Sequence, residues 1–183
     1  ALPIYDDGEL PMTGVTVRLH DAAGNILSQQ VTAADGAFLF SRLAPAPYFL
    51  SFVPPAGYAL TLFTADTTSM LNSDAGEGNS RTALTVLGQG ENDLTWGAGF
   101  YELSSLGDYV WYDFNMNGIQ DADESPVENV SVMLLDADGI VVDSTRTGAD
   151  GFYYFPDLVP DAYTVKFVLP AHYIFTQPDA GNN

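Results

Sequence analysis

The sequence predicts an all-β protein built from tandem antiparallel Greek-key β-sandwiches. Short runs of alternating apolar residues are separated by Asp-Gly and proline-containing turns, and no convincing amphipathic helix is present. An internal repeat is the second observation, because a shift of 115 residues places Ile4 on Ile119 and Tyr58 on Tyr173. The third is an Asp- and Asn-rich stretch, residues 113–124, which lies between two expected strands.

The expected strands follow one another in the same order in both copies. In the first copy they span 15–20, 26–32, 37–40, 47–53, 82–87 and 93–101. In the second copy they span 106–112, 130–135, 140–146, 152–155 and 162–168. Asp-Gly between alternating apolar runs is a hairpin signal, since this dipeptide favours the tight turn that joins antiparallel strands. Many short strands with frequent turns are typical of a Greek-key β-sandwich.

Alternation within the strands predicts which side chains fill the core. The residues expected to face inward are Tyr163, Val165 and Phe167 in the second copy and Tyr48, Leu50 and Phe52 in the first. Lys166 falls on the outward face of its strand. Tyr48 and Tyr163 each follow a proline-containing turn, so we expect each ring to be buried and each hydroxyl to hydrogen-bond the preceding loop.

The repeat divides the chain into residues 1–102 and 103–183. The first copy lacks its first strand and half of its loop, and the second lacks counterparts of the strands at 82–87 and 93–101. Two interpretations stay open: the sequence is a window from a longer tandem array, or neighbouring copies of the repeat complete each other by strand exchange. The short junction at residues 103–105 favours a semi-rigid rod.

Residues 113–124 have the spacing of a twelve-residue calcium loop. Oxygen-bearing side chains occupy loop positions 1, 3, 5, 9 and 12, a glycine occupies position 6, and position 7 offers a backbone carbonyl. The predicted ligands are Asp113, Asn115, Asn117, Ile119, Asp121 and Glu124. The alternative is a surface turn rich in Asp and Asn. Because strands flank the loop, we expect Ca²⁺ to act as a structural clip and not to open a pair of helices.

Three further features are candidates for metal binding or modification. The residues of a second predicted calcium site are Asn72, Asp74 and Glu77. Their segment, 72–80, is also typical of a polar loop, and that alternative stays open. Asp66 and Asp179 could join calcium sites at the end of a module. Asn129 begins an Asn-x-Ser glycosylation sequon.

Composition excludes several function classes. The chain has 24 acidic and 5 basic residues, a net charge of −19, which disfavours nucleic acid and anionic membrane surfaces as partners. No cysteine is present, and no apolar run or signal peptide indicates membrane insertion. The two histidines, His20 and His172, lack a nucleophile motif nearby, and no glycine-rich phosphate loop occurs. We therefore expect carboxylates that are solvated or bind calcium, and no enzyme.

Several motifs resemble the SdrD-type B repeats of bacterial surface proteins, relatives of the collagen-adhesin B-type domain. They are Leu106-Gly-Asp-Tyr-Val-Trp-Tyr-Asp-x-Asn-x-Asn-Gly-Ile-Gln-Asp, Val-x-Val-x-Leu-x-Asp-x-x-Gly, Thr-x-x-Asp-Gly-x-Tyr-x-Phe-x-x-Leu and Tyr-x-Val-x-Phe. The resemblance covers nearly all of the second copy and, more loosely, the first. It implies a calcium-bound, Ig-like or prealbumin-like sandwich that serves as a stalk or spacer outside the cell.

Many collagen-adhesin-type domains stiffen themselves with an isopeptide bond from a lysine on the first strand. Here the single lysine, Lys166, lies on a late strand and faces outward, and the first copy contains no lysine. We expect calcium to take over that role. The resulting prediction is a structural, calcium-stabilised repeat module of an extracellular bacterial stalk, filament or surface layer, on the cell surface or secreted. The alternative is an adhesin module that binds a host protein or a glycan.

Overall fold

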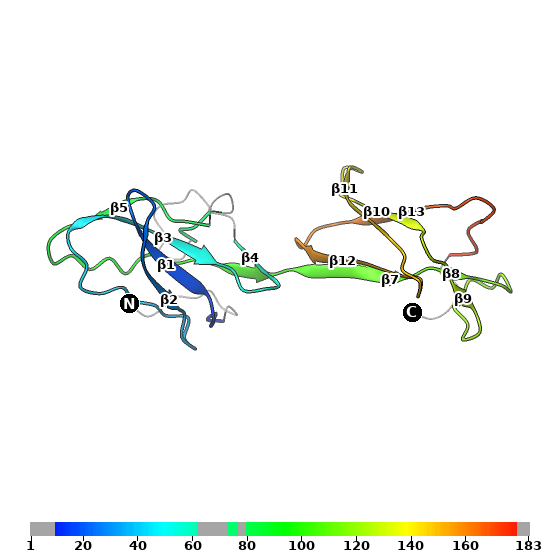
Figure 1. Ribbon diagram of the computed structural model, residues 1–183, viewed down its shortest axis with the longest axis horizontal. Helices are drawn as coiled ribbons and strands as arrows, with labels where there is room; N and C mark the ends of the chain where they lie inside the picture. Colours follow the sequence, from blue (N-terminus) through cyan, green and yellow to red (C-terminus); the bar gives the residue numbers. More distant parts are fainter. Residues whose placement is uncertain (1–9, 62–72, 77–79, 179–183) are drawn as a thin grey trace. The chain divides into compact units, whose positions relative to one another are not determined.

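The computed structural model describes residues 10–61, 73–76 and 80–178. Within these ranges the chain forms strands, turns and irregular segments but no helix, which confirms the predicted all-β fold class. Every strand pair is antiparallel. The chain divides into two compact units, Ala1–Glu102 and Leu103–Asn183, whose strands are drawn as arrows in Figure 1.

The first unit contains two antiparallel sheets. Its strands are β1 (Thr16–Asp21), β2 (Ile26–Val31), β3 (Ala46–Val53), β4 (Tyr58–Leu60), β5 (Thr85–Leu87) and β6 (Phe100–Glu102). One sheet has the order β2-β1-β3-β5, and the other pairs β4 with β6. Because β3 pairs with β1 and not with its sequence neighbour β2, the connection crosses over the hairpin, as a Greek-key sandwich requires.

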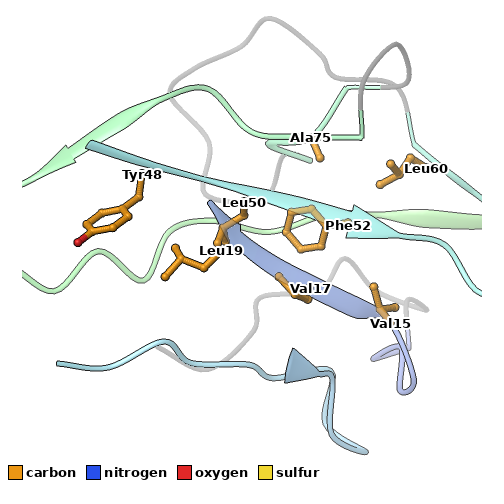
Figure 2. Close-up of a cluster of buried hydrophobic side chains, with 8 residues drawn as sticks. All are labelled: Val15, Val17, Leu19, Tyr48, Leu50, Phe52, Leu60 and Ala75. Atoms are coloured by element: carbon orange, nitrogen blue, oxygen red, sulfur yellow. The ribbon is translucent and has the colours of Figure 1, made fainter. Parts of the chain in front are cut away.

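The core of the first unit lies between these sheets. Figure 2 shows its buried members, which are Val15, Val17, Leu19, Tyr48, Leu50, Phe52, Leu60 and Ala75. They come from β1 and the residue directly before it, from β3, from β4 and from the loop at 73–76. The expected inward positions on β3, Tyr48, Leu50 and Phe52, are all buried. Alternation therefore predicts the face of β3 that enters this core, although Phe49 on the opposite face is also buried, stacked on His20.

The second unit repeats the arrangement. Its strands are β7 (Ser104–Tyr109), β8 (Trp111–Tyr112), β9 (Ser125–Pro126), β10 (Ser131–Leu135), β11 (Val141–Arg146), β12 (Phe152–Leu158) and β13 (Thr164–Val168). One sheet has the order β11-β10-β13, and two-stranded sheets pair β12 with β7 and β8 with β9. The buried cluster is Val132, Leu134, Tyr153 and Phe155, with Tyr163, Val165 and Phe167 packed against it. Lys166 points away from this core and is exposed.

Both predicted tyrosine corners are present. The Tyr48 hydroxyl donates a hydrogen bond to the carbonyl of Ala44 at 2.8 Å, and the Tyr163 hydroxyl donates to the carbonyl of Val159 at the same distance. Each bond spans four residues and fixes the turn that leads into the strand. The two tyrosines therefore have a packing role.

One expected strand, at residues 37–40, is not a strand. Its counterpart in the second unit is part of β12, which pairs with β7, whereas no strand pairs with 37–40 among the residues that the structure describes. The side chain of Gln30 binds this segment from the other side. Its amide donates to the carbonyl of Leu39 at 2.6 Å and accepts from the N–H of Leu39 at 3.1 Å.

Other expected strands are shorter or interrupted. The stretch at 93–101 forms only β6, because its partner β4 has three residues and Asp74 and Asp93 hydrogen-bond the preceding backbone. The strand expected at 82–87 starts at Thr85, and the Thr82 hydroxyl replaces a backbone acceptor for the N–H of Leu50. The strand expected at 106–112 breaks at Val110, which hydrogen-bonds both Gly151 and Val127.

In each unit, the hydroxyl of a buried threonine hydrogen-bonds the backbone on either side of the point where the chain enters the first central strand. The Thr147 hydroxyl donates to the carbonyl of Val127 at 2.7 Å and accepts from the N–H of Val130 at 2.9 Å. The equivalent Thr32 hydroxyl donates to Met12 at 2.7 Å and accepts from Val15 at 3.0 Å. Each hydroxyl satisfies two backbone groups where the chain enters the first central strand, a role that the sequence analysis missed.

Candidate calcium loop

A short ladder closes the loop at residues 113–124. Strands β8 and β9 pair Trp111 with Pro126 and Tyr112 with Ser125, directly before and after the loop. Gly151 lies against this stem, where the N–H of Val110 donates to its carbonyl at 2.9 Å. A Cβ at Gly151 would lie 2.5 Å from the Val110 oxygen, so only glycine permits this close approach. The core of the unit thus fixes the base of the loop.

The first half of the loop is folded around the carboxylate of Asp113. Its two oxygens accept hydrogen bonds from the N–H groups of Asn117 at 3.1 Å and Gly118 at 2.8 Å. Gly118 has a φ of 74°, a conformation that glycine adopts without strain, and it occupies the position where the sequence predicted the sharp turn. The side-chain oxygens of Asn115 and Asn117 each accept a bond from the backbone two residues later.

The second half of the loop is tied back to the first. Both amide nitrogens of Asn115 and Asn117 donate to one oxygen of Asp121, at 2.8 and 2.9 Å. The Glu124 carboxylate accepts from the N–H of Phe114 at 2.9 Å and from the N–H of Asp121 at 3.1 Å. Five of the six predicted ligands therefore belong to one hydrogen-bonded network through their side chains. The sixth, Ile119, is expected to contribute only its backbone carbonyl.

Electrostatics favour an ionised Asp113. Partial burial raises the pKa of its carboxyl group, but the hydrogen bonds from the Gly118 N–H, the Thr176 hydroxyl and the N–H groups of Asn117 and Met116 outweigh this effect. The net result is a pKa below the ordinary value. Thr176 also connects the loop to the segment after β13, as does the edge-to-face contact between Tyr112 and Tyr173 at 6.1 Å.

The donor set matches a hard divalent cation in its chemistry. All six predicted ligands offer carboxylate, amide or carbonyl oxygens, which are the ligands that Ca²⁺ prefers. Within the described part of the chain, no three His, Cys, Asp or Glu side chains converge as a metal-holding group. A cation at the loop would therefore depend on the amides of Asn115 and Asn117 turning their oxygens inward, in place of their hydrogen bonds to Asp121.

Aromatic side chains and a depression accompany the loop. The depression has a volume of about 350 Å³, and its lining residues are Tyr112, Phe114, Asn115, Asp123, Glu124 and Ser125. Phe114 and Met116 are largely exposed, and Phe114 contacts Tyr112 at 6.3 Å between ring centroids. Sequence analysis did not single out these side chains, although they alternate with the predicted ligands within the loop.

Of the remaining predicted positions, the structure describes only Asp74 and Asn129. Of the second predicted calcium site only Asp74 is described, and Asn72 and Glu77 lie outside the described residues, as do Asp66 and Asp179. Burial raises the pKa of Asp74, and its carboxylate accepts a bond from the N–H of Gly97 at 2.7 Å. Asn129 is exposed, and its side-chain oxygen accepts from Arg146 at 3.0 Å.

One serine–histidine contact was not expected from the sequence. The His20 Nε2 atom lies 2.8 Å from the Ser51 hydroxyl, and Nδ1 lies 3.2 Å from the carbonyl of Gly24. The imidazole is buried and stacks on Phe49 at 4.5 Å, over which the Arg81 guanidinium also lies. A backbone carbonyl, and not a carboxylate, orients this ring, so the arrangement is that of a packed and satisfied histidine.

Two antiparallel β-sandwich repeats, one of which carries a loop with calcium-type spacing between strands, define a class of non-helical repeat modules. The chain belongs to the SdrD B-like domain family, whose model matches residues 3–100 and 104–183. It is 36% identical over 182 residues to the serine-aspartate repeat-containing protein D of Staphylococcus aureus strain Newman, covering 98% of this chain and 13% of that protein. It is 34% identical over 181 residues to protein F of Staphylococcus epidermidis, covering 98% of this chain and 10% of that protein.

The chain thus spans only about an eighth or less of the length of these curated relatives. Solved structures give weaker similarity. The Bacillus anthracis TIE protein matches with a TM-score of 0.37 and 15% identity, over 94% of this chain and 29% of that chain. The minor pilin GBS52 of Streptococcus agalactiae matches with a TM-score of 0.32 and 14% identity, over 92% of this chain and 73% of that chain. In the described ranges, no helix has the length and apolar character needed to cross a membrane.

Proposed function

We propose that this chain is a structural, calcium-stabilised repeat module of an extracellular bacterial stalk, filament or surface layer. The observation that carries the proposal is the hydrogen-bonded network of the loop at 113–124, which uses the side chains of five predicted ligands and is closed by β8 and β9. Membership of the SdrD B-like domain family supports a surface-protein module. The module is non-enzymatic and acts by its shape and stiffness.

Calcium stabilises the module by mass action, because the ion binds the folded loop and not the unfolded chain. The loop gathers Asp113, Asp121 and Glu124 in twelve residues of a chain that carries a net charge of −19. A divalent cation would offset the repulsion among these carboxylates. Because the loop joins β8 and β9 directly, ordering the loop also orders the base of the second unit.

The chain path supports a stiff repeat. Strand β6 ends at Glu102 and β7 begins at Ser104, so a single residue separates a strand of the first unit from a strand of the second. A one-residue linker gives little conformational freedom between modules. Neighbouring copies of the same repeat are therefore the partners that we propose, together with calcium.

A second candidate function is an adhesin module that binds a host protein or a glycan. The observation in its favour is the exposure of Phe114 and Met116 beside the depression at the loop. Exposed aromatic side chains on a soluble module are typical of contact surfaces. Substituting Phe114 by Ser would abolish ligand capture by such an adhesin while leaving a structural module intact.

Thermal unfolding with and without calcium tests the main proposal. We expect calcium to raise the melting temperature and excess chelator to reverse this, in the wild type but not in an Asp113→Ala, Glu124→Ala double variant. A matched control removes two exposed acids outside the loop, Glu128→Ala and Asp138→Ala, and keeps the calcium response. Equal melting of the wild type in calcium and in chelator would refute the calcium clip.

A further inference from the structure

Asn117 and Gly118 form the single Asn-Gly pair in the sequence. Asparagine is chemically labile in proteins, and it is most labile before glycine, because glycine has no side chain to hinder attack on the asparagine amide. The Asn117 side chain is exposed, and Gly118 has a φ of 74° at the sharp turn of the loop at 113–124. The pair that most readily loses an amide group is therefore accessible to water.

Loss of this amide group needs only water. The backbone nitrogen of Gly118 attacks the side-chain carbon Cγ of Asn117, so that a new N–C bond forms and the bond between Cγ and Nδ2 breaks. The displaced nitrogen takes up the Gly118 amide proton through solvent and leaves as ammonia, and a cyclic succinimide remains. Water then opens the ring at either carbonyl, which gives aspartate or isoaspartate at position 117.

The folded loop engages all three groups that this reaction uses. The attacking group, the Gly118 N–H, donates to the Asp113 carboxylate at 2.8 Å. The Asn117 side-chain oxygen accepts from the N–H of Ile119 at 2.7 Å, and its nitrogen donates to Asp121 at 2.9 Å. To turn its Cγ toward the Gly118 nitrogen, Asn117 must break both bonds, and the Asp113 carboxylate disfavours negative charge on that nitrogen. Attack therefore requires local opening of the loop.

Asn115 provides a comparison within the same loop. Its side chain is also exposed, and its amide donates to Asp121 at 2.8 Å and accepts from the N–H of Asn117 at 2.9 Å. The residue that follows it is Met116, whose side chain hinders attack by the Met116 nitrogen. Opening of the loop frees both amides, so a difference in their reactivity reports the effect of the glycine.

Conversion of Asn117 to an acid reverses one contact in the loop. The Asn117 side-chain nitrogen donates a hydrogen bond to Asp121, whereas the product places a carboxylate oxygen against the Asp121 carboxylate. Two negatively charged acceptors repel each other at this distance. Carboxylates would then occupy loop positions 1, 5, 9 and 12. A divalent cation can offset this repulsion, because carboxylate oxygens are its preferred ligands.

We propose that Asn117 is a spontaneous deamidation site that reacts when the loop opens, and that the product loop closes only around a divalent cation. The hydrogen-bonded loop is thereby converted into an ion-dependent one. The extent of conversion records the time that the loop has spent open, because the reaction is irreversible. The deamidation site goes beyond the proposed function and needs no calcium, whereas the ion dependence of the product rests on that function.

Peptide mapping by mass spectrometry, with aspartate and isoaspartate resolved, tests the site in chelator at neutral pH. Asn117 should convert and Asn115 should stay intact, at least about tenfold more slowly in the folded chain than in guanidinium chloride. Asp113→Ala removes the acceptor of the Gly118 N–H and should speed conversion about tenfold. The matched control, Asp123→Ala, removes an exposed acid of the same loop and should react at the wild-type rate. The comparison with denaturant needs no variant and so does not depend on how Asp113→Ala folds.

The Asn117→Asp variant tests the behaviour of the product. In chelator its Gly118 amide should lose about tenfold in protection from hydrogen exchange relative to the wild type, and calcium should restore this protection. Asn129→Asp makes the same change at an exposed position outside the loop, and it should match the wild type in both conditions. Calcium should also slow the conversion of wild-type Asn117.

Several outcomes would overturn the proposal. Equal conversion of Asn115 and Asn117, or equal rates in the folded and denatured chain, would remove the guarded site. Slower conversion in Asp113→Ala would show that this carboxylate assists the attack instead of preventing it. Full exchange protection of Asn117→Asp in chelator would refute the ion-dependent product. If calcium restores no protection in that variant while wild-type Asn117 still converts, the calcium clip fails and the deamidation site stands.

Discussion

Replacing Thr147 by valine tests how a single buried hydroxyl holds the second unit together. The Thr147 side chain is 3% exposed, and its hydroxyl serves the carbonyl of Val127 and the N–H of Val130. Valine has nearly the same shape, so the substitution removes the hydrogen bonds and leaves the packing almost unchanged. Each unsatisfied buried backbone group costs about 1–3 kcal/mol. For two groups that can partly relax toward water, we expect a loss of about 2–4 kcal/mol.

Urea unfolding of the second unit, followed by Trp111 fluorescence in a Trp96→Phe background that removes the signal of the first unit, measures this loss. The matched control is Thr145→Val on β11, two residues before Thr147; the Thr145 side chain is half-buried and lies opposite Val132. We expect that control to change stability by less than about 0.5 kcal/mol. Thr32→Val should reproduce the large loss in the first unit, because Thr32 makes the same two bonds. If the Thr147→Val variant is as stable as its control, the argument that these buried hydroxyls stabilise the units through their hydrogen bonds is refuted.

Three further predictions concern the loop and its surroundings. Gly151→Ala should destabilise the second unit by about 2 kcal/mol or more and weaken calcium binding, because the added Cβ would clash with the Val110 oxygen. The control is Gly139→Ala, which has a similar positive φ but no neighbour within 4 Å, and it should lower the free energy of unfolding in urea by only about 1 kcal/mol. Asp74→Asn should raise the melting temperature by ~1–2 °C at pH 7 in chelator and leave it unchanged in acid. Burial raises the pKa of Asp74, so the folded state favours the neutral carboxyl group, and the stability that this group contributes is lost as pH rises through that pKa. A lower melting temperature of this variant in calcium alone would instead indicate that Asp74 is a calcium ligand. Because the pKa of Asp113 is lowered in the folded state, its carboxylate stabilises the fold above the ordinary carboxyl pKa, and this contribution should disappear as pH falls through the folded pKa. The Gly118 amide should lose its protection from hydrogen exchange over the same pH range, and Asp113→Asn should show no such pH step.

The loop at residues 113–124 illustrates what local sequence can predict. Asp113, Asn115 and Asn117 bind backbone groups only a few residues away, so their spacing contains nearly all the information that folds the loop. Tyr48 and Tyr163 were predictable for the same reason, since each bonds a carbonyl four residues earlier. The stem was not predictable in detail, because Gly151 approaches Val110 across the chain and only the folded unit shows that contact.

The sequence by itself determined the all-β class, the repeat and, for the strands at 47–53 and 162–168, the face that enters the core, because alternation and turn residues act over a few positions. Only the tertiary structure decided which strands persist. Residues 37–40 have the alternation of a strand, yet a strand exists only where a neighbouring strand satisfies its backbone. In the second unit that neighbour, β7, is distant in sequence from β12. The buried roles of Thr32 and Thr147 likewise depend on partners brought close by folding, which no local pattern records.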